Sequence, residues 1–250
     1  MRRTAGILFG VFTHALFAFT VWHLVWFLKG IDPGPSDDRD VITGPSVAAA
    51  VAIDSLLAAF FAVPHSLFLV PSVRKAIVTR GIAYPLYGCF YCVITCLALL
   101  TTIFCWQPIA VVLWRWPVPI STLVSGCFIA SWGALLSSLH LTGLGWQTGL
   151  TPWWHWVCGT PQPKRPFVER GAYRVLRHPV YLSFLGLVWF VPVITIDRAV
   201  LMTVWSGYIL TGSVLKDRRL LHFLGSSYRE YQSRVPGYPG MPFGPLARVK

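Results

Sequence analysis

Long apolar runs take up most of this chain and constrain its fold more than any other feature. Four of them have about the 20 residues that a membrane-spanning helix needs, and a fifth is longer. They cover Ala5–Leu28, Ser46–Val70, Pro85–Phe104, Pro119–Leu139 and Tyr181–Leu215. The fifth run is interrupted by Pro192 and by Asp197-Arg198, so we interpret it as two shorter spans joined by a tight turn. The sequence therefore predicts an all-α integral membrane protein with about six transmembrane helices.

The composition agrees with a membrane protein. Charged residues make up only 12% of the chain and hydrophobic residues 55%, whereas soluble domains carry about 25% charged residues. No repeat of fixed period and no long polar linker divides the 250 residues. We therefore expect a single domain, residues 1–250.

The distribution of charge predicts the orientation of the helices. Most Lys and Arg residues lie on one side in this topology, and the other side receives the acidic loop Asp32–Asp40. By the positive-inside rule both termini are expected in the cytoplasm. The formal net charge is +12, but the basic residues flank helix ends and no nucleic-acid motif accompanies them. Anionic lipid headgroups, and not nucleic acid, are the expected partners of this charge.

Six cysteines lie mostly inside the expected helices, and no paired histidines complete a zinc set. The pattern Cys89-x-x-Cys92 is weak evidence for metal or redox chemistry. Apolar packing explains it better, so no metal site is expected.

Two segments on the expected cytoplasmic side are polar enough to build a site. One is the loop Leu141–Arg177, and the other is the tail after Leu215, in which Lys216–Tyr231 is typical of an amphipathic helix. Irregular backbone at a membrane is tolerated where protein covers it. We expect these two segments to fold against each other.

The loop ends in a candidate ligand site at Arg177-His178-Pro179. Proline is favoured in the first turn of a helix, so a helix is expected to begin here. The free N–H groups at its start, beside His178 and Tyr181, would suit a ligand carboxylate. The alternative is that Arg174, Arg177 and His178 anchor a helix at the headgroup level.

Four other polar residues are weaker candidates, and each has a structural explanation. His65 at the end of the second span could be an interfacial hydrogen-bonding group, and Gln147 could be a solvated loop residue. Asp217 could form surface ion pairs or face a cationic cofactor. Asp54 lies inside a span, where a helix-packing hydrogen bond or a protonated acid is expected.

Several motifs together resemble a known family. They are Gly171-Ala-Tyr173, Arg177-His178-Pro179-Val-Tyr181, His222-Phe-Leu-Gly225-Ser-Ser-Tyr228-Arg-Glu-Tyr231 and Arg234-Val-Pro236. This set, within residues 165–236, is similar to the isoprenylcysteine carboxyl methyltransferase superfamily of membrane methyltransferases. Upstream, Pro64-His65-Ser66, Trp106-Gln107-Pro108 and Gly143-Leu-Gly-Trp-Gln147 resemble its bacterial methanethiol S-methyltransferase branch and the related nurim proteins.

The resemblance implies S-adenosyl-L-methionine bound between the loop and the C-terminal segment. The residues implied to line this cofactor are Gln147, Phe167, Val168, Tyr173, His178, Pro179, Val180, Tyr181 and Asp217. The implied catalytic residues are His65, Arg177, His178 and Asp217. Where the family has two glutamates, this chain has Lys216 and Asp217, and a lysine cannot accept hydrogen bonds as a carboxylate does.

The implied reaction is methyl transfer to a small apolar thiol such as methanethiol, which would give a thioether. The thiolate is the nucleophile, so the thiol must lose its proton, and His65 or His178 could accept it. One alternative is methylation of a prenylcysteine carboxylate or another lipidic acceptor. Another is a structural or regulatory membrane protein of the nurim or nitric-oxide-response type, in which the His-Pro motif serves the architecture.

Overall fold

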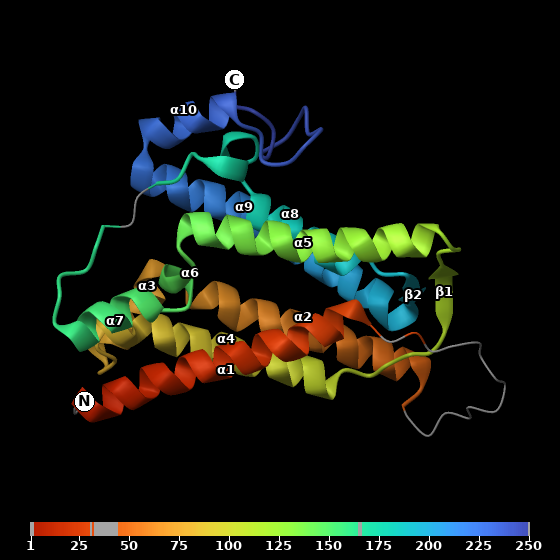
Figure 1. Cartoon of the computed structure of the whole chain (residues 1–250), viewed down its shortest axis with the longest axis horizontal. Coiled ribbons are helices and arrows are strands. Elements are labelled where there is room, and N and C mark those ends of the chain that lie inside the picture. The colour runs from red at the N-terminus through yellow and green to blue at the C-terminus, as the bar shows by residue number, and fades with distance from the viewer. Residues whose placement is uncertain (1–2, 31, 33–44, 165–166, 250) are drawn as a thin grey trace. The chain divides into compact units, whose positions relative to one another are not determined.

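The computed structural model describes residues 3–30, 32, 45–164 and 167–249 of the chain. Most of the expected acidic loop, and the residue Arg165 that opens the motif segment, lie outside the described residues. Within the described part, five helical segments are long and apolar enough to cross a membrane. They are α1 (Arg3–Lys29), α2 (Val47–Leu67), the segment Tyr84–Cys105, α5 (Ile120–Thr142) and α9 (Ile196–Leu224) (Figure 1). The prediction of an all-α integral membrane protein is confirmed.

The expected sixth span is a short helix, α8 (Pro179–Trp189). Its 11 residues extend about 16 Å at 1.5 Å per residue, roughly half the thickness of the hydrocarbon core. Pro192 follows it, and a strand, β2 (Val193–Thr195), precedes α9. The strand β2 pairs with β1 (Val112–Arg115), a small sheet that the sequence did not predict.

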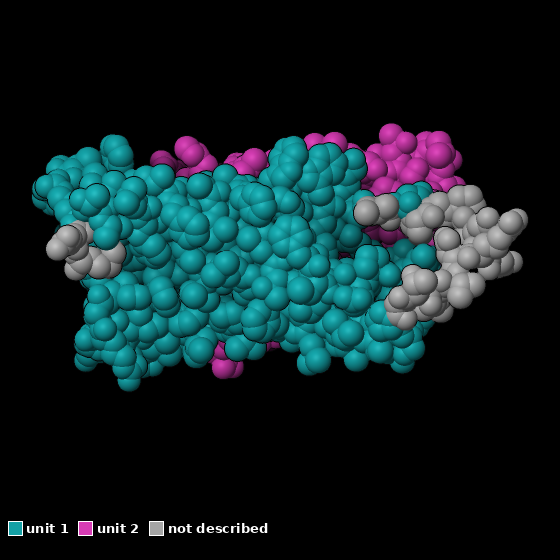
Figure 2. Space-filling model, turned by 90° about the horizontal axis from the view of Figure 1, so that it is seen from below, with its two compact units in different colours: residues 1–111, 143–166, 195–200 teal, residues 112–142, 167–194, 201–250 magenta. Residues whose placement is uncertain are grey.

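The chain divides into two compact units, which are coloured in Figure 2 and described separately. Unit 1 comprises Met1–Val111, Gly143–Pro166 and Thr195–Val200, and unit 2 comprises Val112–Thr142, Phe167–Ile194 and Leu201–Lys250. The first turn of α9 is thus grouped with unit 1 and the rest of that helix with unit 2. The single domain expected from the sequence stays a prediction, because two compact units can belong to one domain.

Unit 1 is a helix bundle in which α1 and α2 both pack against α4 (Tyr87–Cys105). The short elements of this unit are α3 (Pro71–Thr79), η1 (Tyr84–Leu86), α6 (Leu144–Gln147) and α7 (Leu150–Cys158). Helix α7 packs on α4 and α1, and the indole nitrogen of its Trp153 donates to the Gly6 carbonyl at 3.0 Å. The ring fits because Gly10 has no side chain, since a Cβ there would lie 2.1 Å from the indole.

A buried carboxyl group of unit 1 joins the end of one helix to another helix. Asp54 of α2 is fully buried, and its Oδ1 accepts a hydrogen bond from the backbone N–H of Gln107 at 2.8 Å. Gln107 follows the end of α4, so this contact ties α4 to the middle of α2. The expected helix-packing hydrogen bond is confirmed.

Unit 2 contains the contact of α5 with α8, and α5 also contacts η2 (Gly171–Arg174). Gly186 of α8 allows a close approach, because a Cβ there would lie 2.3 Å from the Ser131 hydroxyl oxygen. The end of α9 is followed by α10 (Ser226–Arg234) and by a tail without regular structure.

The amphipathic helix expected over Lys216–Tyr231 is divided between two helices. Lys216–Leu224 continues α9, and α10 begins at Ser226. The intervening Gly225 has a φ of +58°, a conformation that glycine adopts at little cost and that ends a helix. Of the apolar side expected from Leu220, Leu221, Phe223 and Leu224, the three leucines pack against a core of Tyr228, Tyr231 and Val235, whereas Phe223 is 62% exposed.

Candidate functional site

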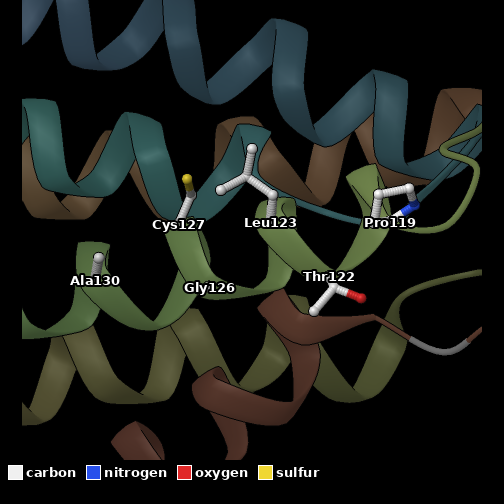
Figure 3. A pocket seen from close by; sticks show the side chains of 6 residues that line it. All are labelled: Pro119, Thr122, Leu123, Gly126, Cys127 and Ala130. Atoms are coloured by element: carbon white, nitrogen blue, oxygen red, sulfur yellow. The ribbon is translucent and has the colours of Figure 1, made fainter.

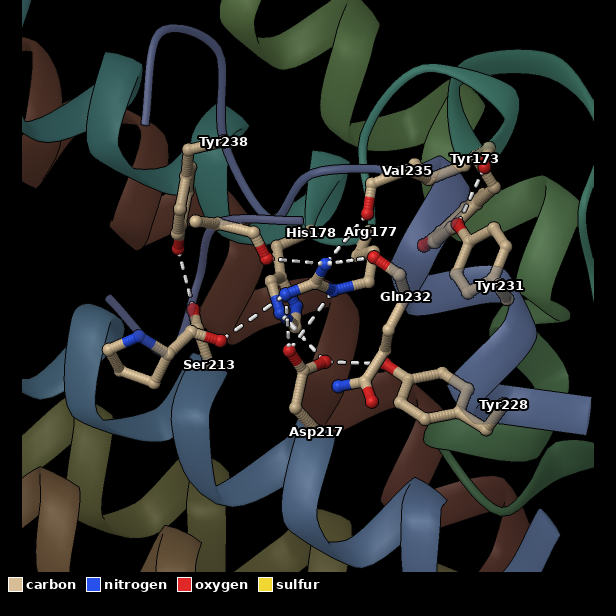
Figure 4. A network of polar contacts seen from close by, with 12 residues as sticks. Tyr173, Arg177, His178, Ser213, Asp217, Tyr228, Tyr231, Gln232, Val235 and Tyr238 are labelled. Atoms are coloured by element: carbon tan, nitrogen blue, oxygen red, sulfur yellow. Dashed lines mark hydrogen bonds and ion pairs between the residues drawn. The ribbon is translucent and has the colours of Figure 1, made fainter. Parts of the chain in front are cut away.

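A buried carboxylate, Asp217 of α9, is the centre of a polar cluster in unit 2 (Figure 4). Its Oδ2 accepts two hydrogen bonds from the Arg177 guanidinium, from Nε at 3.1 Å and from Nη2 at 2.9 Å. Its Oδ1 accepts a hydrogen bond from the Tyr228 hydroxyl and lies 3.0 Å from His178 Nε2. A buried charge is tolerated when it is paired and hydrogen-bonded in this way.

Arg177 connects this carboxylate to the C-terminal tail. Its side chain is fully buried, and Nη1 donates to the carbonyls of Val235 at 2.6 Å and Ala247 at 3.1 Å. Its backbone N–H donates to the Pro236 carbonyl at 2.9 Å. Because its nitrogen donors are engaged by Asp217 and by tail carbonyls, Arg177 holds the tail against the end of α9.

His178 precedes α8 and is fully buried. Although Nε2 lies close to Asp217, neither ring nitrogen has a hydrogen-bond partner with acceptable geometry among the described residues. Burial lowers the pKa of His178 below its ordinary value of 6.5, the Asp217 carboxylate raises it in part, and the charges of Lys216 and Arg177 lower it further. A neutral imidazole with an unsatisfied buried nitrogen can accept a proton or bind a ligand.

Aromatic side chains surround the cluster. The Tyr231 hydroxyl donates to the Tyr173 carbonyl at 2.6 Å, and the hydroxyls of Tyr238 and Ser213 lie 2.6 Å apart. Burial raises the pKa of Tyr238 to about 12, so this phenol is neutral at physiological pH. Phe167 packs edge-on against Tyr231, with ring centroids 5.3 Å apart. The cluster is thus a polar centre inside an aromatic wall.

Lys216 lies beside the same cluster on α9. Its ammonium nitrogen is 5.2 Å from the ring centroid of Tyr181 and 6.0 Å from that of Tyr173. Positions over an aromatic ring within about 6 Å are favourable for a cation. The rings of Tyr173 and Tyr181, which the resemblance implies to line the cofactor, therefore already contact a cation of the protein.

The remaining predicted site residues that belong to unit 2 lie close in sequence to these groups. Pro179 is buried in the first turn of α8, as expected, while Val180 and Val168 are partly buried. Unit 2 therefore contains most of the residues predicted for the cofactor and three of the four predicted for catalysis.

The other two predicted residues, His65 and Gln147, belong to unit 1. His65 lies near the end of α2, and its Nδ1 is 2.9 Å from the Tyr91 hydroxyl of α4. Gln147 is the exposed last residue of α6. His65 thus has a hydrogen-bond partner within unit 1, and both its catalytic role and the interfacial alternative stay predictions.

Sequence reasoning missed several partners of the cluster. Tyr228 was noted only as part of a motif, although it donates directly to Asp217. Tyr238 and Ser213 carried no signal, since a lone tyrosine in a tail and a serine in an apolar helix are common. The tail groups that accept hydrogen bonds from Arg177 are backbone carbonyls, and a pattern of side chains does not predict which carbonyls an arginine will contact.

Two other features offer less chemistry. An open hollow of about 540 Å³ lies along the first half of α5, and its lining is almost entirely apolar (Figure 3).

Cys89, Cys92 and Cys96 are buried in α4, as expected for packing, and the sulfur atoms of the last two are 4.0 Å apart. No three His, Cys, Asp or Glu side chains that could hold a metal ion come together in the described part of the chain.

The fold and the site together define a class: a membrane protein of several spanning helices with a buried carboxylate, arginine and histidine cluster built around the end of its last long helix. Comparison with known proteins gives the family. The chain is 30% identical over 232 residues to methanethiol S-methyltransferase 1 of Bradyrhizobium diazoefficiens, covering 92% of this chain and 80% of that protein. The chain belongs to the methanethiol S-methyltransferase family.

Other relatives agree with this membership. The methanethiol S-methyltransferase of Pseudomonas sp. (strain GM41(2012)) is 29% identical over 240 residues, covering 93% of this chain and 89% of that protein. The nurim protein of Rattus norvegicus is 28% identical over 197 residues, covering 75% of this chain and 74% of that protein. No family model matches the chain, and no solved structure gives a significant match. The resemblance to the methanethiol and nurim branch is confirmed.

Proposed function

We propose that this protein is a membrane methyltransferase that uses S-adenosyl-L-methionine to convert a small thiol such as methanethiol to its thioether. The observation that carries the proposal is His178, whose ring is fully buried in a polar cluster with Nε2 3.0 Å from Asp217 Oδ1, and whose Nδ1 has no hydrogen-bond partner among the described residues. Membership of the methanethiol S-methyltransferase family supports the reaction class.

The residues of unit 2 fit the cofactor by their chemistry. The start of α8 offers backbone N–H groups for a carboxylate at Val180 and Tyr181, whereas Pro179 has no N–H. Phe167 and Val168 offer apolar surface for the adenosine, and Tyr173 and Tyr181 offer aromatic faces that a ligand cation would share with Lys216. When bound, S-adenosyl-L-methionine would supply a methyl group on a positively charged sulfur.

The chain's own residues would prepare the acceptor. His178, neutral because burial lowers its pKa, can take the proton of the thiol on a ring nitrogen. Asp217 would stabilise the resulting imidazolium, and Arg177 would hold Asp217 in place while binding the tail. Aromatic and apolar walls exclude water from the reacting groups. His65 and Gln147 of unit 1 remain candidates for a catalytic and a cofactor contact.

The proposal is tested by binding and product formation with the detergent-purified protein. Calorimetry should detect saturable binding of S-adenosyl-L-methionine, weakened at least about tenfold, or about 1.4 kcal/mol, in His178→Ala. Arg218→Ala, at an exposed position of α9 next to Asp217, is the control and should bind normally. Gas chromatography should detect dimethyl sulfide from methanethiol. A folded wild-type protein that neither binds the cofactor nor methylates a thiol or a prenylcysteine would support the non-catalytic, nurim-like alternative.

We also propose that both termini and the loop before α8 face the cytoplasm, as the charge distribution predicts. Two exposed cysteines of unit 1 provide the test, Cys105 at the end of α4 and Cys158 at the end of α7. In single-cysteine variants of intact cells, an impermeant maleimide should label Cys105 but reach Cys158 only after permeabilisation. Labelling in the reverse order would contradict the orientation.

A further inference from the structure

His178 is a weak base for removing the proton of the thiol substrate in the proposed reaction. The pKa of a free cysteine thiol is about 8.5, whereas burial keeps the pKa of His178 below 6.5. Transfer of the proton to His178 is therefore unfavourable by more than about 100-fold for such a thiol. A cation that stabilises the thiolate would remove this deficit.

Arg177 is not available for that purpose. Its Nε and Nη2 bind Asp217, and its Nη1 binds carbonyls of the tail, so its donors are used within the protein. The carboxylate of Asp217 in turn accepts hydrogen bonds from Arg177 and Tyr228 and lies 3.0 Å from His178 Nε2. The charge of Arg177 is thus paired within the protein.

Lys216 is a cation in direct contact with the aromatic wall. Its side chain is partly buried, and its ammonium nitrogen lies over the rings of Tyr181 and Tyr173 at 5.2 and 6.0 Å. The ring of Tyr181 is also 5.5 Å from the ring of His178, so ammonium and imidazole share one corner of unit 2. Aromatic rings attract an ammonium without neutralising its charge.

We infer that Lys216 is the acceptor-binding residue of this protein and that its ammonium holds the thiol as a thiolate beside Tyr173, Tyr181 and His178. The inference rests on the proposed function. A sulfonium drawn to the same aromatic faces would lie close to an ammonium, and two like charges at short range repel each other. A thiolate between them removes that repulsion, so the corner selects an anionic acceptor.

The proton balance of this binding step is simple. The S–H bond of the acceptor breaks, its proton passes to His178 or to the buffer, and the electron pair stays on sulfur. Lys216 keeps its own proton throughout. The ionisable groups that surround this corner come from η2, the start of α8, α9 and the tail: Tyr173, Arg177, His178, Tyr181, Tyr208, Asp217, Arg219 and Tyr238.

The first test measures ionisation of a bound thiol without any methyl transfer. Ethanethiol is titrated with pH in the presence of the purified protein, and its thiolate is followed by ultraviolet difference absorbance. In wild type the midpoint should lie at least about one pH unit below that in Lys216→Met, a tenfold change in the ionisation constant. Lys216→Arg keeps the positive charge and should retain most of the shift. Arg218→Met removes a neighbouring but exposed charge and should behave as wild type.

The second test separates this inference from the proposed function. Lys216→Met should still bind S-adenosyl-L-methionine by calorimetry, which also reports that it is folded. Its rate of ethanethiol methylation at pH 7 should fall about 10-fold to 100-fold and recover as the pH is raised. For an aromatic thiol that is already ionised at pH 7, the methylation rate should fall much less in Lys216→Met.

Two outcomes would overturn the role of Lys216 while leaving the proposed function intact. One is an active wild type whose thiol ionises at the same pH with and without the lysine. The other is a Lys216→Met variant that binds the cofactor more tightly with unchanged thiol ionisation, which would make Lys216 a competitor for the cation position. Failure of wild type to bind the cofactor or to methylate any thiol would instead contradict the proposed function itself.

Discussion

Unit 1 and unit 2 are both built from apolar helices, but different forces fix their irregular segments. In unit 1 the segment with α7 is held by close backbone approach, because a Cβ on Gly88 of α4 would lie 2.6 Å from the Gly149 Cα. In unit 2 the C-terminal tail is held by the guanidinium of Arg177 and its carbonyl partners. The close backbone contact in unit 1 contains no charged group, whereas the buried charged cluster of unit 2 contains groups that can take part in chemistry.

Two buried carboxyl groups, Asp54 of unit 1 and Asp217 of unit 2, repeat this contrast. Asp54 of unit 1 accepts one backbone hydrogen bond, and its Oδ2 has no partner in the described part of the chain. Asp217 of unit 2 accepts two hydrogen bonds from Arg177 on Oδ2 and one from the Tyr228 hydroxyl on Oδ1, and an imidazole lies nearby. One carboxyl group therefore serves helix packing, and the other organises a site.

Asparagine substitutions at these two positions should differ most in effect. Asp217→Asn leaves the buried Arg177 without a counter-charge and should lower the free energy of unfolding by about 3–5 kcal/mol. Asp54→Asn keeps an oxygen that can accept from the Gln107 N–H and should cost about 1 kcal/mol or less. Denaturant unfolding in detergent micelles measures both. Equal losses of unfolding free energy would show that the two carboxyl groups contribute equally to stability, contrary to this prediction.

The steric contact of unit 1 should be the next most sensitive. Gly88→Ala places a methyl group against backbone that cannot rotate away, so it should lower the free energy of unfolding by about 1–3 kcal/mol. Gly126→Ala in α5 has open space around its Cβ and serves as the control. The same unfolding assay applies, and a neutral Gly88→Ala would mean that α7 is not fixed by this approach.

The cluster of unit 2 should also make stability depend on pH through His178. Its pKa is lowered in the folded state, so the unfolded chain binds a proton first as the pH falls below about 6.5. Stability is therefore complete above that pH and decreases below it, by up to about 1.4 kcal/mol per pH unit. Melting temperatures between pH 5 and 8 should show this slope in wild type and lose it in His178→Gln. A slope that survives in the variant must come from another group.

The exposed ion pair at the edge of unit 2 should have the smallest effect. Arg234 and Glu169 contact each other at 3.0 Å, but both side chains are exposed to solvent. Arg234→Ala should therefore lower the free energy of unfolding by less than about 1 kcal/mol. A loss comparable to that of Asp217→Asn would mean that burial is not what distinguishes the two pairs.

Particular residues show how far the sequence could predict the site. Pro179 marked the start of α8 correctly, because proline is favoured where a helix begins. Gly225 was not recognised as the break between α9 and α10, because the amphipathic pattern continues across it. Arg177 was chosen as catalytic from its motif, but its bonds to tail carbonyls could not be predicted, since they depend on how a segment without regular structure folds back.

The sequence by itself determined that this is a helical membrane protein, because the length and hydropathy of a span are local properties of the chain. It also determined the family, through motifs that lie close together between residues 165 and 236. Only the tertiary structure decided that Asp217 is paired with Arg177 and Tyr228, and that Lys216 lies over Tyr173 and Tyr181. Those contacts join residues from separate elements, and their energies depend on burial and distance, which exist only once the chain has folded.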